Sequence, residues 1–396
     1  MKADPRELFS ESMELQMGPS HPATHGTIKF DLKLEGEKIL DCDVVVGYLH
    51  RGFAKMCEQV TWTQVIPYTD RLNYVSPLIN NVGYALAVEK LLGVETPARC
   101  QFIRVIMSEL SRITDHLTCC GMAASELGAI TVGFYLIEAR ELLIRIIEVV
   151  TGARLTISYT RIGGVKHDLP PDFAEQVTKA FRKSRQLLAD CDRLLSRNRI
   201  FIDRMSGLGV LSQETAIAYG LTGPILRSTG VSYDVRKAEP YLVYDQLDFE
   251  IPIGTKGDNY DRFICRMLEI EQSMRIVEQA LKKIPLGPVS LDDPHVVLPE
   301  KEKVYNSIEG LMHHFKIIME GIQVPAGEVY LAVEGGNGEL GFYIVSNGGG
   351  KPYRVRVRPP CFIAMSAFRE MIKGSMIADI IPTFGMINMI GGECDR

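Results

Sequence analysis

The sequence has no Cys-x-x-Cys pair, although it contains nine cysteines. An odd number of cysteines at scattered positions argues against a framework of disulfides and favours a reducing compartment. Soft thiolate ligands at close spacing are what nickel, zinc and iron–sulfur centres require. We therefore expect this chain to bind no metal ion and no cluster.

Long apolar runs are also missing. No stretch approaches the roughly 18 to 20 uninterrupted apolar residues of a membrane-spanning helix, and the start, MKADPRELFSESMELQ, has no apolar run behind a basic end. We expect neither a transmembrane segment nor a secretory signal. A peripheral position on a membrane complex stays compatible with this pattern.

There is no excess of positive charge and no familiar catalytic loop. The formal net charge is −5 at pH 7, which gives no reason to expect nucleic acid as a partner. No Gly-x-Ser-x-Gly motif supports acyl hydrolysis. The glycine-rich stretch at residues 335–354 matches neither the Gly-x-x-x-x-Gly-Lys-Ser/Thr pattern nor a Gly-x-Gly-x-x-Gly pattern that opens a helix. It lies between strand-like segments, so it predicts hairpin turns.

The chain has 396 residues, of which 46% are hydrophobic, enough for one large or two ordinary domains. Residues 28–46 alternate apolar and polar side chains around a turn at Glu35-Gly36, which predicts two paired strands. Helical periodicity with start and stop signals predicts long helices at residues 77–93, 98–129, 132–152, 170–198 and 258–284. Asp258 is the expected N-cap of the last of these.

Residues 285–303 are rich in proline and predict a connecting loop. Three short β-rich runs at 327–335, 338–350 and 353–360 then predict a small antiparallel sheet. The fold class expected is α+β, with a core bundle of long helices and small antiparallel sheets near both ends. We expect residues 1–13 to form a tail and residues 14–396 a single domain, because no flexible linker divides them.

The stretch GPSHPATHGT carries His21 and His25, four residues apart. On a helix this spacing could hold zinc, but Pro19, Pro22 and Gly26 disfavour a helix here. A turn containing two histidines is the simpler interpretation. Elsewhere, Glu109, Arg112 and His116 in ELSRITDHL follow helical spacing and predict charge pairs within one helix. Residue chemistry alone names no reaction.

A set of blocks taken together is more specific than any of these motifs. The chain resembles the 49 kDa (D) subunit of respiratory complex I from about Glu14 to Arg396, with the blocks in family order: GPSHPATHGT, GYLHRGFAKM, PYTDRLNYVSP, ALAVEKLLG, RVIMSELSRI, RIGGVKHDLP, TGVSYDVRKAEPY, KGDNYDRF, GELGFYIVSNGG, YRVRVRPP and GECDR. That family is similar to the large subunit of nickel–iron hydrogenases. The resemblance implies a hydrogenase-like fold, in agreement with the helix-rich core expected above.

The relation to hydrogenases also raises a rival function. A hydrogenase needs four thiolates from two Cys-x-x-Cys pairs. Asn73 and Ser76 stand where the first pair would be, and Ile390 and Glu393 where the second would be, with Cys394 one position out of register. With none of the four ligands present, hydrogen chemistry is excluded.

The resemblance implies instead that the former metal cavity binds a quinone headgroup as substrate. Reduction places negative charge on both quinone oxygens, so a good site offers a neutral donor to one and a titratable donor to the other. Matching the family motifs gives the first role to Tyr74 and the second to His25; unperturbed pKa values are about 10 for tyrosine and about 6.5 for histidine. Glu126 stands where the family's acidic partner of this histidine is usually aspartate.

Two further positions relate to an iron–sulfur cluster that the family holds in a partner subunit. Arg51 matches the family arginine near that cluster, where its positive charge would favour the reduced state. Thr156 stands where the family often has a histidine that links cluster reduction to proton uptake. We therefore expect that route of pH-dependent tuning to be missing.

The resemblance implies the quinone-site subunit of a proton-translocating NADH:quinone oxidoreductase, inactive alone and peripheral on the cytoplasmic side of the cell inner membrane. Its implied partners are the iron–sulfur (B) subunit, the C and I subunits, and the membrane-embedded H and A subunits, with NADH and FMN bound elsewhere in the complex. The alternative is an equivalent complex fed by ferredoxin or another donor, which this sequence cannot separate because the chain does not contact the donor. A purely structural scaffold without quinone chemistry should lack the Tyr74/His25 pair, and both residues are present.

Overall fold

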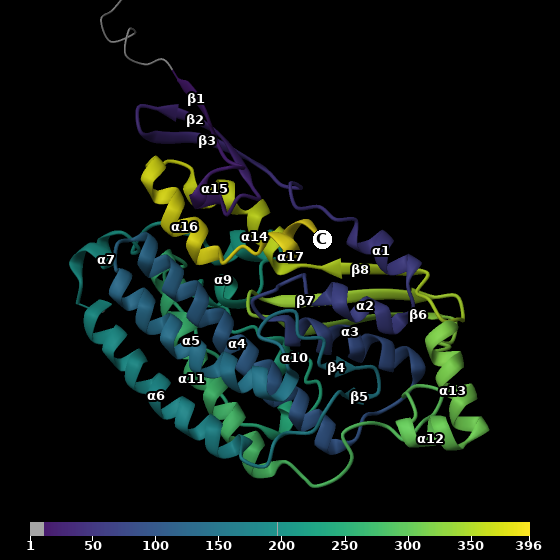
Figure 1. Ribbon diagram of the computed structural model, residues 1–396. Coiled ribbons are helices and arrows are strands. Elements are labelled where there is room, and N and C mark those ends of the chain that lie inside the picture. The colour runs from purple at the N-terminus through teal and green to yellow at the C-terminus, as the bar shows by residue number, and fades with distance from the viewer. Residues whose placement is uncertain (1–11, 196) are drawn as a thin grey trace, which may run out of the picture.

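The computed structural model describes residues 12–195 and 197–396. Long helices form the centre of the molecule, and two of its three small antiparallel sheets lie near the two ends of the chain (Figure 1). The predicted α+β class is confirmed. Most of the expected tail lies outside the described residues, but Met13 belongs to the first strand, β1 (Met13–Met17).

Four long helices make up the largest part of the buried core: α4 (Ala98–Glu126), α5 (Ile130–Thr151), α6 (Phe173–Leu195) and α11 (Asn259–Lys283). They run side by side in Figure 1, with α4 between α5 and α11. Two predicted helix ends are confirmed: the N-cap of α11 and the glycine that ends α5. The Asp258 side chain accepts a hydrogen bond from the Asp261 backbone N–H at 2.8 Å, and Gly152 ends α5 in the left-handed conformation at φ +82°.

Helices α4 and α5 approach each other closely through glycine. A Cβ atom on Gly133 would lie 2.0 Å from the Ser125 hydroxyl oxygen and 3.1 Å from the Gly121 carbonyl oxygen. A side chain there would have to displace the Ser125 hydroxyl group and would still press on the Gly121 carbonyl oxygen. The glycine therefore permits the close approach of the two helices near the C-terminal end of α4.

The N-terminal sheet joins β1 to the predicted hairpin of β2 (Lys29–Glu35) and β3 (Lys38–Val45). The hairpin is confirmed, with Gly36 in its turn at φ +60°; β1 was not expected. The sheet packs on C-terminal helices α15 (Phe368–Ile372) and α16 (Ile380–Ile387). Phe30 stacks on Phe368 at 4.7 Å and meets Phe384 edge-on at 5.6 Å, which brings the two ends of the chain together.

The C-terminal sheet contains β6 (Gly327–Glu334), β7 (Glu339–Ser346) and β8 (Arg354–Arg358), as predicted. Helix α3 (Pro77–Leu92) lies against it, and a Cβ on Gly83 would come within 2.9 Å of Val333.

The remaining helices are α1 (Phe53–Gln59), α2 (Trp62–Thr69), α7 (Arg199–Asp203), α8 (Gln213–Ala218), α9 (Gly223–Ser228), α10 (Val235–Ala238), α12 (Lys301–Asn306), α13 (Ile308–Met319), α14 (Pro360–Ser366) and α17 (Gly391–Asp395). Strands β4 (Thr160–Arg161) and β5 (Gly164–Val165) pair as a minimal hairpin. The predicted loop at 285–303 is shorter than expected and ends at Glu300, because helix α12 begins at Lys301. The sequence of residues 301–303 gave no signal for the start of this helix.

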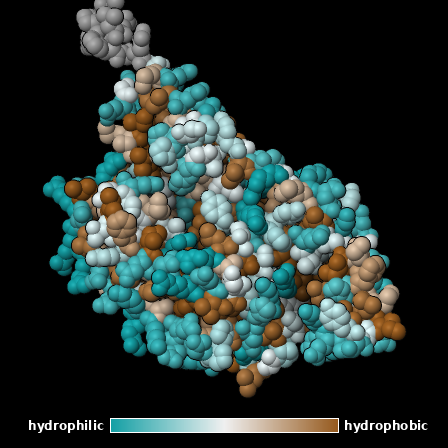
Figure 2. Space-filling model, in the orientation of Figure 1, coloured by the Kyte–Doolittle hydropathy of each residue, from teal (hydrophilic) through white to brown (hydrophobic). Residues whose placement is uncertain are grey.

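The surface is mostly polar, with apolar side chains concentrated on α12 and α13. Figure 2 shows brown surface in that region at the lower right, where Tyr305, Ile308, Leu311, Phe315 and Met319 are exposed. Within residues 12–195 and 197–396, no helix is long and apolar enough to cross a membrane.

Candidate functional site

The C-terminal segment, residues 384–396, contacts three of the residues expected at the site: His25, Arg51 and Glu126. Asn388 turns the chain at φ +57°, a conformation that asparagine tolerates, between α16 and the buried helix α17. The Asp395 carboxylate then accepts hydrogen bonds from the backbone N–H groups of Gly47 at 2.9 Å and Leu49 at 2.7 Å. The loop that carries Arg51 is thus fixed to the end of the chain.

His21 and His25 lie at opposite ends of a single 3-10 turn, Pro22–Thr24. The His21 ring accepts a hydrogen bond from the Ala23 backbone N–H at 3.2 Å and so caps the turn. His25 ends the turn in the left-handed conformation at φ +53°. The structure agrees with the turn interpretation, and the two histidines have different roles in it.

The His25 imidazole packs on Phe384, with ring centroids 4.9 Å apart, while part of the residue stays exposed to solvent. Desolvation by the surrounding protein lowers the pKa of His25, and a backbone hydrogen bond with Met389 opposes that shift. The imidazole is therefore mainly neutral at pH 7, and it sits against the C-terminal segment at Phe384 and Met389.

Tyr74 lies between α2 and α3 and is 42% exposed. Partial burial raises the pKa of its phenol, nearby Cys361 acts in the same direction, and Arg51 opposes both. The phenol stays protonated at neutral pH and can donate a hydrogen bond. Arg51 is also exposed; its guanidinium donates to the backbone oxygens of Arg71 at 2.7 Å and Gly392 at 3.3 Å.

Glu126 ends α4, and desolvation raises the pKa of its carboxyl group to about 7. A Cβ on Gly385 would lie 3.0 Å from Glu126 Oε2, so the carboxyl group lies beside α16 next to Phe384, on which His25 packs. Among the described residues no hydrogen bond joins Glu126 to His25. Their partnership stays a prediction.

Thr156 is exposed and adopts a left-handed backbone conformation at φ +48°. This conformation is unusual for a β-branched residue and costs of order 1–3 kcal/mol. Ser158, two residues later at φ +46°, is held by the Asp70 carboxylate, which accepts hydrogen bonds from its hydroxyl and its backbone N–H. The strained segment is thus tied to the end of α2.

Two of the positions where a hydrogenase would carry thiolates, Asn73 and Ser76, form a polar network with Asp115 of α4 and Asn388. The Asp115 carboxylate accepts hydrogen bonds from Asn73 Nδ2 at 2.9 Å, Ser76 Oγ at 2.7 Å and Asn388 Nδ2 at 2.8 Å. These side chains are all buried. Within residues 12–195 and 197–396, no group of three or more His, Cys, Asp or Glu side chains could hold a metal ion. Amide and hydroxyl donors around a carboxylate fit no nickel–iron centre.

Glu393 lies next to this network. Burial raises the pKa of its carboxyl group to about 7, and the negative charge of Asp115 acts in the same direction. Hydrogen bonds from Cys361 and Asn337 oppose this rise. Asn337 is joined to Asn388 by reciprocal hydrogen bonds of 3.0 and 2.7 Å. Asp115, Asn388 and Asn337 therefore form one continuous buried hydrogen-bonded group, and the buried Glu393 lies beside it.

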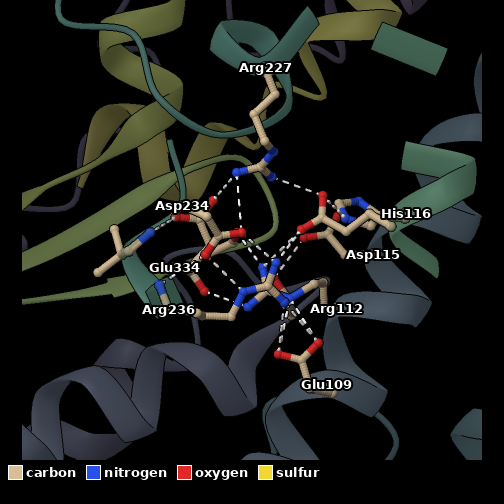
Figure 3. Close-up of polar contacts among 12 residues, drawn as sticks. Glu109, Arg112, Asp115, His116, Arg227, Asp234, Arg236 and Glu334 are labelled. Atoms are coloured by element: carbon tan, nitrogen blue, oxygen red, sulfur yellow. Dashed lines mark hydrogen bonds and ion pairs between the residues drawn. The ribbon is translucent and has the colours of Figure 1, made fainter. Parts of the chain in front are cut away.

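A larger cluster of buried charges continues from α4 to α11 and the C-terminal sheet (Figure 3). Arg236 bonds to Asp234, Glu109 and Glu269 at 2.6, 3.1 and 2.8 Å. Arg227 bonds to Glu269 at 2.9 Å and to Glu334 at 2.8 Å. Opposing the effect of burial, nearby guanidinium groups lower the pKa of Glu109.

The expected charge series on α4 is only partly correct. Glu109 does pair with Arg112 at 3.2 Å, but both are fully buried, and His116 faces Glu269 of α11 at 3.2 Å. A helical spacing of charges predicts the local pair. It does not reveal that the same charges are neutralised by segments more than 100 residues away, as Arg236 does for Glu109.

Sequence reasoning missed Asp115, Asn337, Asn388 and Cys361 as parts of the site. Asp115 had a visible signal, because it lies on a strongly apolar helix where an unpaired carboxylate would be costly. Asn337 and Asn388 had none, since each is a polar residue next to glycine or in a turn. Their role depends on loops that meet only in the folded chain.

Comparison with known proteins supports a single family. The family described as "Respiratory-chain NADH dehydrogenase, 49 Kd subunit" matches residues 126–396. The D 1 subunit of NADH-quinone oxidoreductase from Sorangium cellulosum is 58% identical over 391 residues, covering 98% of this chain and 97% of that protein. The D subunit of the same enzyme from Myxococcus xanthus is 54% identical over 389 residues, covering 98% and 94%.

A further relative joins two subunits in one protein. The C/D subunit of NADH-quinone oxidoreductase from Bdellovibrio bacteriovorus is 49% identical over 389 residues, which are 98% of this chain and 70% of that protein. The expected family is confirmed by matches that extend over nearly the full length. This chain belongs to the 49 kDa subunit family of the respiratory-chain NADH dehydrogenase, which includes the D subunits of NADH-quinone oxidoreductase.

Proposed function

We propose that this subunit forms the quinone headgroup site of a proton-translocating NADH:quinone oxidoreductase, next to the terminal iron–sulfur cluster of a partner subunit. The observation that carries the proposal is the arrangement of His25 and Tyr74. Both are partly exposed; His25 packs on Phe384 of the C-terminal segment, and Tyr74 lies near Arg51 and Cys361.

The chemistry of the two residues suits the two quinone oxygens. Tyr74 keeps its proton at neutral pH and offers a hydrogen bond to the oxygen on which charge develops. His25 is neutral at rest and can take up and pass on a proton within the physiological range. Glu126, at the end of α4, is the acidic partner proposed for His25, and Arg51 presents a positive charge toward the partner's cluster.

The partners proposed are the iron–sulfur (B) subunit, the C and I subunits and the membrane-embedded H and A subunits, on the cytoplasmic side of the cell inner membrane. The fused C/D relative supports the association with the C subunit. The exposure of His25, Tyr74, Arg51 and Thr156 is consistent with a site completed by another subunit. Electrons would then enter through the iron–sulfur subunit, and this chain would contribute its part of the quinone cavity.

Tyr74→Phe in the assembled complex tests the proposal. It removes one hydroxyl group and should lower NADH:quinone reductase activity with short-chain quinones at least tenfold, while electron transfer to an artificial acceptor upstream of the quinone stays at the wild-type level. Tyr305→Phe, at an exposed tyrosine of α12, is the matched control. Wild-type quinone kinetics in assembled Tyr74→Phe complex would contradict the assignment.

His25→Ala and His21→Ala form a second pair. His25→Ala should damage quinone reduction or proton coupling, whereas His21→Ala removes only a turn cap and should leave both intact. Mass spectrometry of the electron-input subunits in the purified native complex would separate the NADH-driven enzyme from an equivalent complex fed by ferredoxin. A scaffold without quinone chemistry would show no effect of Tyr74→Phe or His25→Ala.

A further inference from the structure

Two adjacent residues of α16, Phe384 and Gly385, each contact one member of the proposed His25–Glu126 pair. The Phe384 ring packs against the His25 imidazole, with centroids 4.9 Å apart and ring planes tilted by 60°. The Glu126 carboxyl group lies against Gly385, where a Cβ atom would come within 3.0 Å of Oε2. Within the described part of the chain, no hydrogen bond joins His25 to Glu126, so α16 is the element that contacts both.

The Phe384 ring is held in place by two other aromatic side chains. It is 1% exposed, and it meets Phe30 edge-on at 5.6 Å and Phe368 edge-on at 6.1 Å. Those two rings stack on each other at 4.7 Å. Because a ring enclosed in this way cannot turn freely, the surface that it offers to His25 has a fixed position.

Helix α16 is anchored at the residues around this contact. The Cys119 thiol of α4 donates a hydrogen bond to the Gly385 carbonyl oxygen at 3.6 Å. Asn259 Nδ2 of α11 donates to the Thr383 hydroxyl oxygen at 3.0 Å. Since a shift of α16 would break these buried hydrogen bonds, the helix is fixed relative to α4, which also carries Glu126.

The absence of a side chain at Gly385 leaves the space in which the Glu126 carboxyl group lies. A Cβ atom there would be too close to Oε2, whereas its next neighbour, the Ala123 Cβ atom, would be at an ordinary 3.7 Å. The backbone of Gly385 is helical, so alanine fits its conformation. An added methyl group would therefore displace the end of the flexible Glu126 side chain and leave the helices in place.

We propose that Phe384 and Gly385 are the positioning residues of the His25–Glu126 pair: the Phe384 ring fixes the imidazole, and Gly385 leaves room for the carboxyl group beside the same turn of α16. This inference rests on the proposed quinone site. Neither residue needs to touch the quinone, because each acts through the side chain that it places. The separation of the imidazole and the carboxyl group is then set by one anchored helix.

Gly385→Ala in the assembled complex tests the space beside Glu126. The displaced carboxyl group should lower the turnover number for a short-chain quinone by about tenfold, with little change in KM. Alanine has the higher helix propensity, so the thermal stability of the complex should not fall. Gly327→Ala is the matched control, because a Cβ atom there would meet only Leu91, at 3.6 Å, and turnover should stay at the wild-type level.

Combining Gly385→Ala with Glu126→Asp separates positioning from a merely structural role. The aspartate carboxyl group ends one methylene earlier and clears the new methyl group. Gly385→Ala should therefore cause no further loss of turnover in a chain that already carries Glu126→Asp. A loss of equal size in both backgrounds would show that the glycine does not act through Glu126. That result, or wild-type turnover in Gly385→Ala alone, would overturn the inference.

Phe384→Leu and Phe368→Leu test the other contact. Both substitutions remove a buried ring from the same cluster, but only the first removes the surface on which His25 packs. Phe384→Leu should lower turnover by about tenfold, whereas Phe368→Leu should cause a similar loss of stability and keep most of the turnover. Equal turnover in the two variants would overturn the role given to Phe384.

The outcome also distinguishes this inference from the proposed function. If Tyr74→Phe impairs quinone reduction while Gly385→Ala and Phe384→Leu do not, the quinone site stands and only the positioning role fails. If Tyr74→Phe has no effect, the quinone site itself fails.

Discussion

The side-chain amide of Asn388 donates a hydrogen bond of 2.8 Å to the carboxylate of Asp115, joining the turn after α16 to the middle of α4 across 273 positions of sequence. The other oxygen of Asp115 accepts from Asn73 and Ser76. One buried carboxylate therefore organises three segments of the site, and its partners are all neutral donors.

Asn388→Asp should destabilise the folded chain by about 3 kcal/mol at pH 7, because it replaces a donor with a second buried carboxylate. The like charges raise the pKa of the pair in the folded state. The variant should thus lose little stability below about pH 4, where both carboxyls are protonated in either state, and progressively more as pH rises. Denaturant unfolding of the full chain at several pH values measures this.

The exchange Asp115→Asn with Asn388→Asp is the matched control. It restores one carboxylate and one amide and should recover part of the lost stability, giving a favourable coupling free energy in a double-mutant cycle. Recovery should be incomplete, because Asn73 and Ser76 then face an amide with a single acceptor oxygen. Strict additivity of the two substitutions would show that the Asp115–Asn388 contact does not matter for stability.

Arg236→Met should lower the free energy of unfolding by about 3–5 kcal/mol, since it leaves the carboxylates of Asp234, Glu109 and Glu269 without a guanidinium that all three contact. Arg369→Met is the comparison, because Arg369 pairs with Asp41 at the surface and its loss should barely move the unfolding midpoint. Equal unfolding midpoints for the two variants would show that the buried charge cluster in Figure 3 stabilises the fold no more than a surface ion pair does.

Glu126→Gln should change the pH dependence of stability. The folded-state pKa is raised from 4.5 to about 7 by desolvation, so the wild-type chain is fully stabilised below about pH 4.5 and loses stability as pH rises toward 7. Glutamine does not ionise, and the variant should become relatively more stable above pH 7. Because Glu126 is partly open to solvent, we expect less than about 1 kcal/mol. Thermal unfolding of the wild type and of Glu126→Gln between pH 5 and 8 tests the direction of this change. A difference in stability between the two that stays constant over this pH range would contradict the prediction.

The long helices were predictable because their signals are local. Pro77 and Gly93 bound α3, Asp258 caps α11, and apolar spacing specifies the buried face of each helix. The strand β1 escaped prediction, since MELQM is short and only its pairing with β2 makes it a strand. Local periodicity carries information about elements, and little about which elements meet.

The site divides in the same way. His25, Tyr74, Arg51 and Glu126 could be named from motifs that resemble a known family. The Asp115 network depends on where Asn337 and Asn388 lie after folding. Their hydrogen bonds link residues from 24 to 273 positions apart, and no pattern within one segment specifies such contacts.

Thr156→His is a gain-of-function prediction. The left-handed conformation at φ +48° is strained for a β-branched residue, and histidine populates it more readily, so the exposed site should accept the substitution without loss of folding. In the assembled complex the partner's cluster should have a midpoint potential that is independent of pH between 6 and 8 with Thr156. With histidine, proton uptake coupled to cluster reduction should lower the potential by up to about 59 mV per pH unit above the histidine pKa.

Thr156→Asn is the control, because asparagine also suits the left-handed backbone but does not titrate. It should leave the midpoint potential independent of pH. Redox titration followed by electron paramagnetic resonance distinguishes the two, and a flat potential in the histidine variant would separate this position from the cluster.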